Sequence, residues 1–458
     1  MRSPSAPPPA PRSPTEILKD RGYLGVLIIG AALGIPVAVV AYFFLKVVAE
    51  AQQYFFTNLP TDLGFQGEPI WWPVPLLVLS GLLVALTIRY LPGTAGHEPA
   101  EGFKPAGAVR PIDLPGIVIA SVTTLSLGVV LGPEAPLIAI GSGLGVLAMY
   151  LLKKDAPKQA VMIIAAAASF AAISTLIGGS PLAGAFLLME AAGIGGSMLG
   201  VVLVPGLLAA GLGALIFLGL DTLTGFGRFS LSIPDIPTFT TPTVAEFLWA
   251  IGIGLAAAVL GGAIKRLARA LQPAVARRRV MLTPVLGFTI GALAIVFAEG
   301  SGKSSSEVLF SGQSALPSLI QNAGEWAVGA LVLLIACKGL AYALSLSAFR
   351  GGPTFPGMFI GAVGGIALSH LPGLPMIAGA AMGIGAMTAV MLELPLTAVL
   401  FTAIFLSADA VALTPLVIVA VVVGYVANAH LGPLSAPSVS AGKAPDQRDE
   451  RGLEPATT

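Results

Sequence analysis

Long apolar stretches with almost no charge are the feature that most restricts how this chain can fold. Residues 159–220 contain one charged side chain, Glu190, and residues 371–442 contain two, Glu393 and Asp409. About 20 apolar helical residues cross a bilayer core about 30 Å thick, so each stretch has room for several membrane helices. In the whole chain 55% of residues are hydrophobic and 10% are charged, whereas a soluble domain usually carries roughly 25% charged residues. The sequence therefore predicts an all-α polytopic membrane protein.

The charge balance and the scarcity of metal ligands exclude several other classes of protein. With 24 Lys and Arg against 23 Asp and Glu, the net charge is +1, so the chain has no basic field that could hold a nucleic acid. Cys337 is the single cysteine, and His97, His370 and His430 are far apart in the sequence, without the spacing of a metal site. We expect no cofactor, no metal and no nucleic-acid partner.

Apolar segments of two lengths follow one another along the chain. Those long enough to cross a bilayer are 23–48, 72–91, 113–131, 197–220, 245–264, 281–298 and 326–347. Those that glycine and proline cut short are 137–152, 160–177, 181–193, 357–370, 375–391 and 395–408. Inside a membrane an interrupted helix is tolerated only where its free backbone groups are buried in protein or line a polar cavity. The short segments therefore predict a transport pathway.

Basic residues indicate the orientation of the chain in the membrane. Six lysine or arginine residues lie within 265–279, and by the positive-inside rule they place that end of the preceding helix in the cytoplasm. The amino-terminal tail is also basic, so we expect both termini on the cytoplasmic side of the cell's inner (plasma) membrane. The expected domains are a disordered cytoplasmic tail (1–22), a first membrane repeat (23–220), an external linker (221–244), a second membrane repeat (245–430) and a disordered tail (431–458).

A pair of similar motifs supports two repeats of opposite topology. Residues 132–136 read Gly-Pro-Glu-Ala-Pro, and residues 352–356 read Gly-Pro-Thr-Phe-Pro. Each is followed by a second, similar sequence motif, which reads Pro-Leu-Ala-Gly at 181–184 and Pro-Leu-Thr-Ala at 395–398. Two pairs in the same order, one in each half, predict an inverted repeat, in which transporter sites form near the midplane where the repeats meet.

Each five-residue motif is predicted to begin a helix. Proline fits a first helical turn, where N–H groups have no partner within the helix, and glycine allows a sharp turn before it. Free N–H groups and the helix dipole attract anions, so two such starts facing each other form an anion site without lysine or arginine. Glu134 lies in one of them, where its carboxylate can occupy the anion's position when ionised and leave it when protonated. A simple helix-capping role for Glu134 is the alternative.

With these motifs the chain resembles the CLC family of chloride channels and chloride/proton antiporters. The first motif is similar to the family's Gly-Arg/Lys-Glu-Gly-Pro, with Glu134 in the gating-glutamate position, and the second is similar to Gly-x-Phe-x-Pro. The resemblance implies a CLC-type fold with two inverted-topology repeats and broken helices, and a homodimer in the lipid bilayer. It also implies chloride or another small anion as the substrate. The candidate anion-binding residues are Gly132, Ala135, Thr354, Phe355, Thr94, Ala95 and Ser435.

The chain departs from the family around the expected inner anion site. Ala95, with Thr94 beside it, stands where the family has an anion-binding serine. Near the carboxyl end Ser435 is found where the resemblance implies a pore tyrosine. Thr354 replaces the pore-lining phenylalanine, so its hydroxyl is expected to compensate for the lost ligands.

A second departure concerns proton transfer. Ala191 takes the position of the antiporters' internal proton-transfer glutamate, and Glu190 precedes it. Adjacent helix positions point about 100° apart, so Glu190 does not simply replace that glutamate. Glu134 and Glu190 are the candidates for a proton pathway, but proton coupling itself is not predicted.

Two other functions stay open at this stage. A cation-coupled transporter of another small solute requires an intramembrane Asp or Asn near broken helices, and Asp409 is the sole intramembrane Asp. An intramembrane enzyme requires a nucleophile or a metal cluster, and no His/Ser or paired-Asp arrangement stands out in the spans. The favoured interpretation is transport of chloride or another anion through a glutamate-gated pathway, as a channel or as a chloride/proton exchanger, without enzyme activity.

Overall fold

The computed structural model consists of helices joined by short loops. It describes residues 19, 21–103, 107–153, 155–176, 180–193, 198–225, 239, 241–406 and 410–432. Within this part of the chain there is no β-strand, and one isolated β-type pairing joins Gly132 to Gly352. Nine helices of the described part are long and apolar enough to cross a membrane. The prediction of an all-α polytopic membrane protein is confirmed.

The first half of the chain runs from α2 to α9. Its helices are α2 (Arg21–Gln53), which continues through the π-helical turn Tyr54–Asn58 into α3 (Leu59–Asp62), then α4 (Pro73–Tyr90), α5 (Leu114–Ser126), α6 (Glu134–Leu152), α7 (Lys158–Leu176), α8 (Pro181–Ala191) and α9 (Met198–Thr224). Three short 3-10 turns, Pro92–Ala95, Pro99–Glu101 and Pro111–Asp113, connect α4 to α5. Because α9 continues past the expected end of the first repeat, Asp221 lies in a helix and not in the linker.

The second half runs from α10 to α17. Its helices are α10 (Val244–Arg277), α11 (Arg279–Ser301), α12 (Leu316–Gln321), α13 (Val328–Ala348), α14 (Thr354–Leu368), α15 (Met376–Leu392), α16 (Pro395–Leu406) and α17 (Ala410–His430). Two 3-10 turns, Ser305–Glu307 and Ala323–Glu325, lie between α11 and α13. The first of these helices begins at Val244 and the last ends at His430.

Three of the predicted segment lengths are wrong. Segment 113–131 contains only the 13-residue α5, because the chain turns at Gly128, whose φ is +95°. Segments 137–152 and 160–177 lie in α6 and α7, which have 19 residues each and are long enough to cross. Pro136 does not shorten α6 because it lies in the first turn, where a helix tolerates proline. The other four short segments are confirmed as α8, α14, α15 and α16.

The same order of helices follows each motif. After 132–136 come α6 and α7, the short α8 of 11 residues and the long α9 of 27. After 352–356 come α14 and α15, the short α16 of 12 residues and the longer α17 of 21. Helix pairs α6–α7 and α14–α15 also pack closely in the same way. This order agrees with the internal repeat predicted from the motifs.

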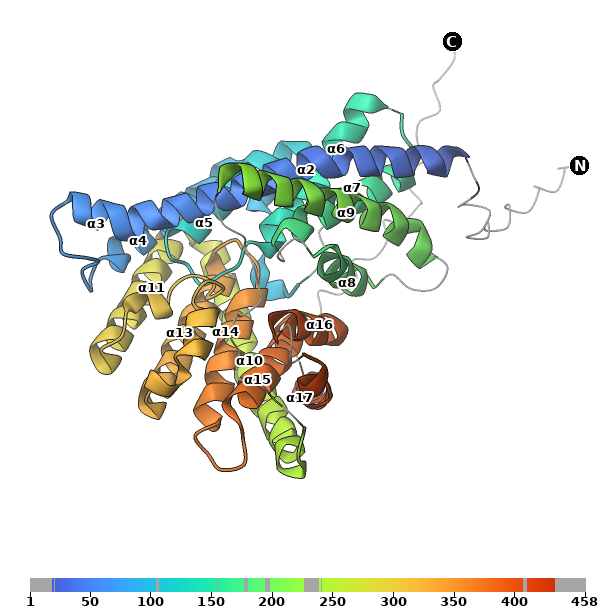
Figure 1. Ribbon diagram of the computed structural model, residues 1–458. Helices are drawn as coiled ribbons and strands as arrows, with labels where there is room; N and C mark the ends of the chain where they lie inside the picture. Colours follow the sequence, from blue (N-terminus) through green and yellow to red (C-terminus); the bar gives the residue numbers. More distant parts are fainter. Residues whose placement is uncertain are drawn as a thin grey trace, which may run out of the picture.

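The two halves pack against each other with their helices in different directions (Figure 1). Helices α2, α7 and α9 lie side by side in one half, and α10, α13, α14 and α15 pack together in the other. The halves meet where α4 packs on α11 and where α8 packs on α16. The two motifs, which are hydrogen-bonded to each other, therefore lie at the interface of the halves.

Glycines let α14 and α15 approach until their backbones touch. A Cβ atom at Gly365 would lie 1.9 Å from the carbonyl oxygen of Gly379, and one at Gly383 would lie 2.0 Å from that of Gly361. Pair α6–α7 repeats this arrangement, since a Cβ at Gly141 would lie 2.7 Å from the Ala168 oxygen. Membrane helices associate through such small residues because lipid supplies no hydrophobic drive for their contact.

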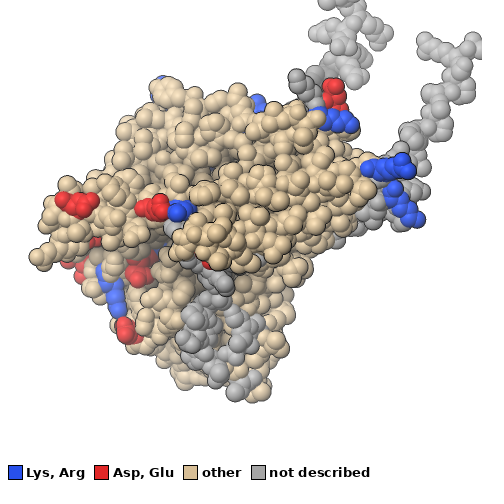
Figure 2. All heavy atoms as spheres, turned by 45° about the horizontal axis from the view of Figure 1, so that its top comes forward, with Lys and Arg blue, Asp and Glu red and all other residues tan. Residues whose placement is uncertain are grey.

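Charged side chains leave much of the surface apolar. On the face drawn in Figure 2, Lys, Arg, Asp and Glu lie mainly near the edges, and the broad area between them is formed by other residues. Large apolar side chains such as Leu215, Val259 and Val411 are exposed. Such a surface suits contact with lipid tails or with another membrane protein.

Substitution of one glycine on α14 is expected to destabilise the protein, and substitution of its neighbour is not. Gly365→Ala forces the backbones of α14 and α15 apart, and overpacking of this kind costs about 1 to 3 kcal/mol or more. Gly364→Ala is the matched control, because a Cβ there has open space around it. Thermal unfolding of the purified variants in detergent measures the difference. Equal melting temperatures would contradict the close backbone contact.

Candidate functional site

The two motif segments are joined by their own backbones. The Gly132 N–H donates to the Gly352 oxygen at 2.8 Å, and the Gly352 N–H donates to the Gly132 oxygen at 2.6 Å. Helix α6 starts at Glu134 and α14 starts at Thr354, directly after this pair. The first turns of both helices are thereby held together in the interior, where their free N–H groups attract negative charge.

The Glu134 carboxylate lies at the start of the opposite helix. Its residue is 1% exposed, and Oε1 accepts a hydrogen bond from the Thr354 N–H at 2.5 Å. The second oxygen, Oε2, is buried and has no hydrogen-bond partner in the described part of the chain. Glu134 therefore does cap a helix, but it caps α14 rather than its own α6. The carboxylate thus lies at a helix start, which is a position that attracts anions.

Two glycines leave the space that the carboxylate fills. A Cβ at Gly132 would lie 2.1 Å from Oε2 of Glu134, and a Cβ at Gly352 would lie 2.1 Å from its Cδ. We expected Gly132 to bind an anion. Its amide is instead bonded to Gly352, so this N–H is not free to do so. Its contribution is the space next to the carboxylate.

The start of α14 supplies further polar groups. Thr354 is 1% exposed, and its hydroxyl oxygen is buried without a hydrogen-bond partner in the described chain. The following residue, Phe355, is also in the first turn of α14 and is buried. Tyr342 of α13 donates its hydroxyl to the Pro353 oxygen at 2.5 Å, which holds the preceding turn in place. An anion that replaced the carboxylate would meet the Thr354 N–H and hydroxyl.

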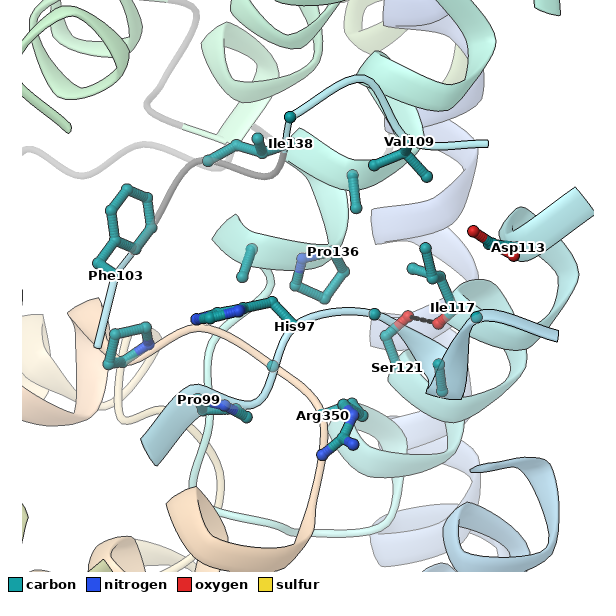
Figure 3. A pocket seen from close by; sticks show the side chains of 18 of the residues that line it. His97, Pro99, Phe103, Val109, Asp113, Ile117, Ser121, Pro136, Ile138 and Arg350 are labelled. Atoms are coloured by element: carbon teal, nitrogen blue, oxygen red, sulfur yellow. Dashed lines mark hydrogen bonds between the residues drawn. The ribbon is translucent and has the colours of Figure 1, made fainter. Parts of the chain in front are cut away.

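A cavity of about 390 Å³ reaches one side of this site. Figure 3 shows it with Val109 and Ile138 at one end and Pro99 and Arg350 at the other. We call it the Arg350 cavity; its lining includes Gly93, Ala95, Gly96, His97, Phe103, Asp113, Ile117, Ser121, Ala135, Pro136, Gly351 and Pro353. The cavity thus extends to the starts of both α6 and α14.

A second cavity, of about 300 Å³, reaches the motif by way of other residues. We call it the Phe310 cavity; it is lined by Leu45, Val48, Ala49, Gln52, Leu125, Leu131, Pro133, Leu176, Phe310, Ser311, Gln313, Ser314 and Pro317. The residues from 310 to 317 follow the carboxyl end of α11, whereas Arg279, at its amino end, pairs with Glu98 near the Arg350 cavity. The two cavities therefore approach the Glu134 region from opposite ends of α11.

The remaining predicted anion ligands differ in position. Ala95 lines the Arg350 cavity and Ala135 does so from α6. Thr94 is exposed and is not among the lining residues, so its hydroxyl is turned away from the cavity. Both Thr94 and Ala95 have positive φ values, 51° and 57°, which are strained for residues with a side chain. Ser435 lies outside the described residues.

Glu190 is occupied at another helix start. Its carboxylate accepts hydrogen bonds from the N–H groups of Leu396 at 2.9 Å and Thr397 at 2.6 Å, and from the Thr397 hydroxyl at 2.6 Å. Glu190 therefore links α8 of the first half to α16 of the second half. This contact gives the residue a structural role that its position next to Ala191 did not indicate.

Lys338 holds the loop that borders the Phe310 cavity. It is fully buried on α13, and its Nζ donates to the carbonyl oxygens of Glu307, Val308 and Leu309 at 2.9, 3.1 and 2.9 Å. These three acceptors match the three N–H bonds of an ammonium group, and the Phe310 oxygen lies at 3.4 Å as a fourth, longer contact. The lysine is thus fully bonded to the loop that follows α11.

An ionic cluster lies beside the Arg350 cavity. Glu98 Oε1 pairs with Arg279 at 2.9 Å and with Arg350 at 3.1 Å, and Gln272 donates to Oε2. Burial by itself raises the pKa of Glu98, but the hydrogen bonds from Arg279 and Gln272 and the charges of both arginines lower that pKa to about 2. Because this pKa is lowered, ionised Glu98 gives the fold its full stabilisation above the ordinary glutamate pKa of 4.5. That stabilisation is lost as the pH falls through about 2. Mild acid therefore leaves this cluster ionised.

Arg350 is the site residue that the sequence reasoning missed. It lies two residues before Gly352 and is the only lysine or arginine in residues 339–442. Its isolation in an apolar region was the available signal, since a charge there requires a partner or a function.

Comparisons with known proteins agree with this geometry. Residues 81–428 match the family described as Voltage gated chloride channel. A protein of Salmonella newport (strain SL254) that bears the name ion-transport protein YfeO is 31% identical over 371 residues, which cover 80% of this chain and 84% of that protein. Its namesake in Escherichia coli O7:K1 is 26% identical over 348 residues, 75% of this chain and 79% of that protein.

Two solved structures are similar in fold. A slow cyanobacterial Cl⁻/H⁺ antiporter superposes with a TM-score of 0.71 and 18% identity, over 89% of this chain and 95% of that chain. A CLC-type fluoride/proton antiporter gives a TM-score of 0.61 and 18% identity, over 88% and 95%. At this identity the likeness concerns the fold, and it confirms the predicted CLC-type architecture.

The close fit of Glu134 against Gly352 makes a prediction about stability. Gly352→Ala places a methyl group where the carboxylate lies, so we expect a loss of about 1 to 3 kcal/mol, typical of overpacking. In a protein that already carries Glu134→Ala the same change should cost much less, because the space is then free. A double-mutant cycle of thermal unfolding measures the coupling. The same loss in both backgrounds would show that the carboxylate is not next to Gly352.

Proposed function

Because the chain belongs to the CLC family of voltage-gated chloride channels, we propose that it carries chloride or another small anion through a pathway that Glu134 closes. The family comprises channels and transporters, so the chain transports anions or exchanges them and is not an enzyme. The single observation that supports the glutamate gate is the position of its carboxylate, bonded to the first N–H of α14 between the Arg350 cavity and the Phe310 cavity.

The proposed gate is a competition between two negative charges. An ionised Glu134 holds the Thr354 N–H and fills the space left by Gly132 and Gly352. Protonation removes the charge that the helix start attracts, so the side chain can leave and an anion can enter. The unpaired Oε2 of Glu134 and the unpaired hydroxyl of Thr354 favour this exchange, because buried polar atoms without partners destabilise the closed state.

The Arg350 cavity is proposed to open to the cytoplasm. The basic residues at 265–279 lie at the end of α10 and the start of α11, and one of them, Arg279, pairs with Glu98 beside this cavity. By the positive-inside rule these basic residues lie in the cytoplasm, and in the proposed orientation the Phe310 cavity then opens to the outside. Both termini are then cytoplasmic and the membrane is the cell's inner membrane.

We further propose that the subunits form a homodimer. Helices α8, α9, α16 and α17 carry exposed apolar side chains that include Leu182, Leu215, Leu396 and Val411. Helix α8 packs on α9 and on α16, and α16 packs on α17, so these apolar side chains belong to neighbouring helices. Family membership favours a second subunit as the partner that covers them.

The anion flux is proposed to depend on pH, but not to be coupled to a fixed number of transported protons per anion. Glu190, the second candidate for a proton pathway, accepts three hydrogen bonds from the start of α16, and Ala191 provides no titratable group. The Glu190 carboxylate is engaged in these bonds, so a proton that reaches Glu134 finds no free carboxylate at position 190 or 191. The result is an acid-opened anion pathway.

The first test uses Glu134→Gln in liposomes. The parent protein should carry chloride faster on acidification from about pH 7.5 to pH 5, whereas the uncharged variant should be fast and insensitive to pH, because it cannot hold the helix start electrostatically. Glu98→Gln is the control, since the ionic cluster is charged throughout this range. An undiminished pH response in Glu134→Gln would refute the gate.

The same liposomes test coupling and substrate. A chloride gradient should not drive protons uphill through the parent protein, and robust proton pumping would refute uncoupled transport. Parallel fluxes of chloride, fluoride, nitrate and sodium separate an anion pathway from a cation-coupled transporter. Sodium-dependent flux without chloride flux would support the latter.

A second prediction concerns Thr354. Thr354→Val keeps the shape and removes the hydroxyl; a hydrogen bond to a charged group contributes about 1.5 to 3 kcal/mol, so anion affinity should fall about tenfold or more. Thr388→Val is the matched control, because that buried hydroxyl is bonded within α15 to Ile384. Calorimetry with chloride, in a Glu134→Gln background that leaves the site open, provides the affinities. Equal affinities for the two variants would show that the Thr354 hydroxyl is not a ligand.

A further inference from the structure

A strongly basic cavity lies where the end of α4 meets the turn between α10 and α11. It has a volume of about 480 Å³ and is lined by Ile88 and Arg89 of α4 and by residues 276–281. Half of its lining residues are arginines, namely Arg89, Arg277, Arg278 and Arg279. We call this cavity the arginine pocket. Its volume is in the range of small-ligand sites, about 300 to 1,000 Å³.

Direct backbone contact holds the two helices at the pocket in place. A Cβ atom at Gly81 of α4 would lie 2.6 Å from the Thr283 oxygen, and one at Gly287 of α11 would lie 2.2 Å from the Leu77 oxygen. Residue 77 therefore meets 287 and residue 81 meets 283, so the helices are antiparallel and the end of α4 lies beside the start of α11. The pocket is thus formed by segments whose relative position is fixed.

Most of the positive charge around the pocket is not neutralised. Arg279 pairs with Glu98 at 2.9 Å, and a second arginine shares that carboxylate. Arg89, Arg277 and Arg278 make no hydrogen bond and no ion pair with other residues in the part of the chain that the structure describes. Like charges around one cavity repel each other, and a bound anion relieves this repulsion. Guanidinium groups suit phosphate in particular, because they bind its oxygens in a bidentate way.

Apolar side chains continue from the pocket along α11. Met281, Val285 and Phe288 are 55%, 51% and 55% exposed, and their spacing of four and three residues puts them on one face of the helix. At the end of α4, the exposed Tyr90 ring lies 5.5 Å from the Arg89 guanidinium, and tyrosine is typical of the membrane–water interface. A charged pocket followed by an apolar strip matches a phospholipid, which joins a phosphate to acyl chains.

We propose that the arginine pocket binds the phosphate of an anionic glycerophospholipid whose acyl chains lie along the apolar strip of α11. Basic pockets between membrane helices on the cytoplasmic side are suited to anionic headgroups. The assignment to the cytoplasmic leaflet rests on the orientation proposed above. Binding of the lipid does not depend on the Glu134 gate, because none of the gate residues lines this pocket.

The alternative is that these arginines only orient the chain in the membrane. Arginine side chains at helix ends extend to the interface without any specific partner. In that case each arginine of the segment 265–279 contributes equally to the attraction of anionic lipid. A specific pocket predicts that the arginines that line it matter and that the others do not.

The experiment measures lipid binding to the full-length protein by native mass spectrometry from a neutral detergent. Phosphatidylglycerol should bind the parent protein about tenfold more tightly than phosphatidylcholine with the same acyl chains. Arg278→Gln should weaken phosphatidylglycerol binding about fivefold, and Arg278→Gln combined with Arg277→Gln about tenfold or more. Phosphatidylcholine binding should not change in either variant.

Arg266→Gln is the matched control for Arg278→Gln. It removes one charge from the same basic segment, but Arg266 donates to the Leu431 oxygen and does not line the pocket. Its effect on phosphatidylglycerol binding should be less than about threefold. A loss equal to that of Arg278→Gln would overturn the pocket in favour of a general effect of charge.

A water-soluble headgroup distinguishes a lipid site from a site for free phosphate. Glycerol 3-phosphate lacks acyl chains, so it should not displace phosphatidylglycerol at equal concentration. Displacement at equal concentration, or equal binding of the two lipids by the parent protein, would overturn the proposal. If the double variant is not monodisperse, Arg89→Gln replaces it, because that change alters the pocket from α4. Binding as tight as in the parent would then also overturn the proposal.

Discussion

The two backbone hydrogen bonds between Gly132 and Gly352 are the interaction on which the rest of the site depends. They join the two halves where α6 and α14 begin, so that a side chain on one helix can reach the first N–H of the other. The helix starts supply partial positive charge without any ionised group. The two glycines have two roles, because they allow the backbones to approach and they leave room for the Glu134 carboxylate. A larger residue at either position would separate the helix starts or expel the carboxylate.

The Glu134 carboxylate makes fewer hydrogen bonds at the start of α14 than Glu190 makes at the start of α16. One oxygen accepts the Thr354 N–H, whereas the other oxygen and the nearby Thr354 hydroxyl have no partner in the described chain. A carboxylate with every lone pair satisfied would be a permanent cap, because its removal would cost all of its hydrogen bonds. Glu190 illustrates that case, since both of its oxygens are bonded at the start of α16. The two glutamates occupy similar helix starts, and the smaller number of bonds at Glu134 is what the proposed gate requires of a side chain that has to leave.

Local sequence patterns predicted the features that arise within one segment. The two Gly-Pro motifs start helices at Glu134 and Thr354, and the short segments at 181–193 and 395–408 are short helices. Features that depend on distant contacts were missed. Helix α5 ends before a turn at Gly128, whose oxygen accepts a hydrogen bond from the distant Phe310 N–H. The roles of Arg350 and Glu190 come from partners more than 200 residues away in the sequence. Periodicity carries no information about such pairs, and only the packing of the two halves brings them together.

The Glu134 position and the Arg350 side of the site rely on different donors. At the Glu134 position the donors are neutral N–H groups at the starts of two helices, so in the proposed mechanism an anion gains a modest attraction and can exchange with a carboxylate. Binding of this strength suits transport, which requires that an anion is held favourably and yet reversibly. On the Arg350 side the charges are paired with one another, because Glu98 is shared between Arg279 and Arg350. This ionic cluster ties the loop before α5 to the segment that leads into α14.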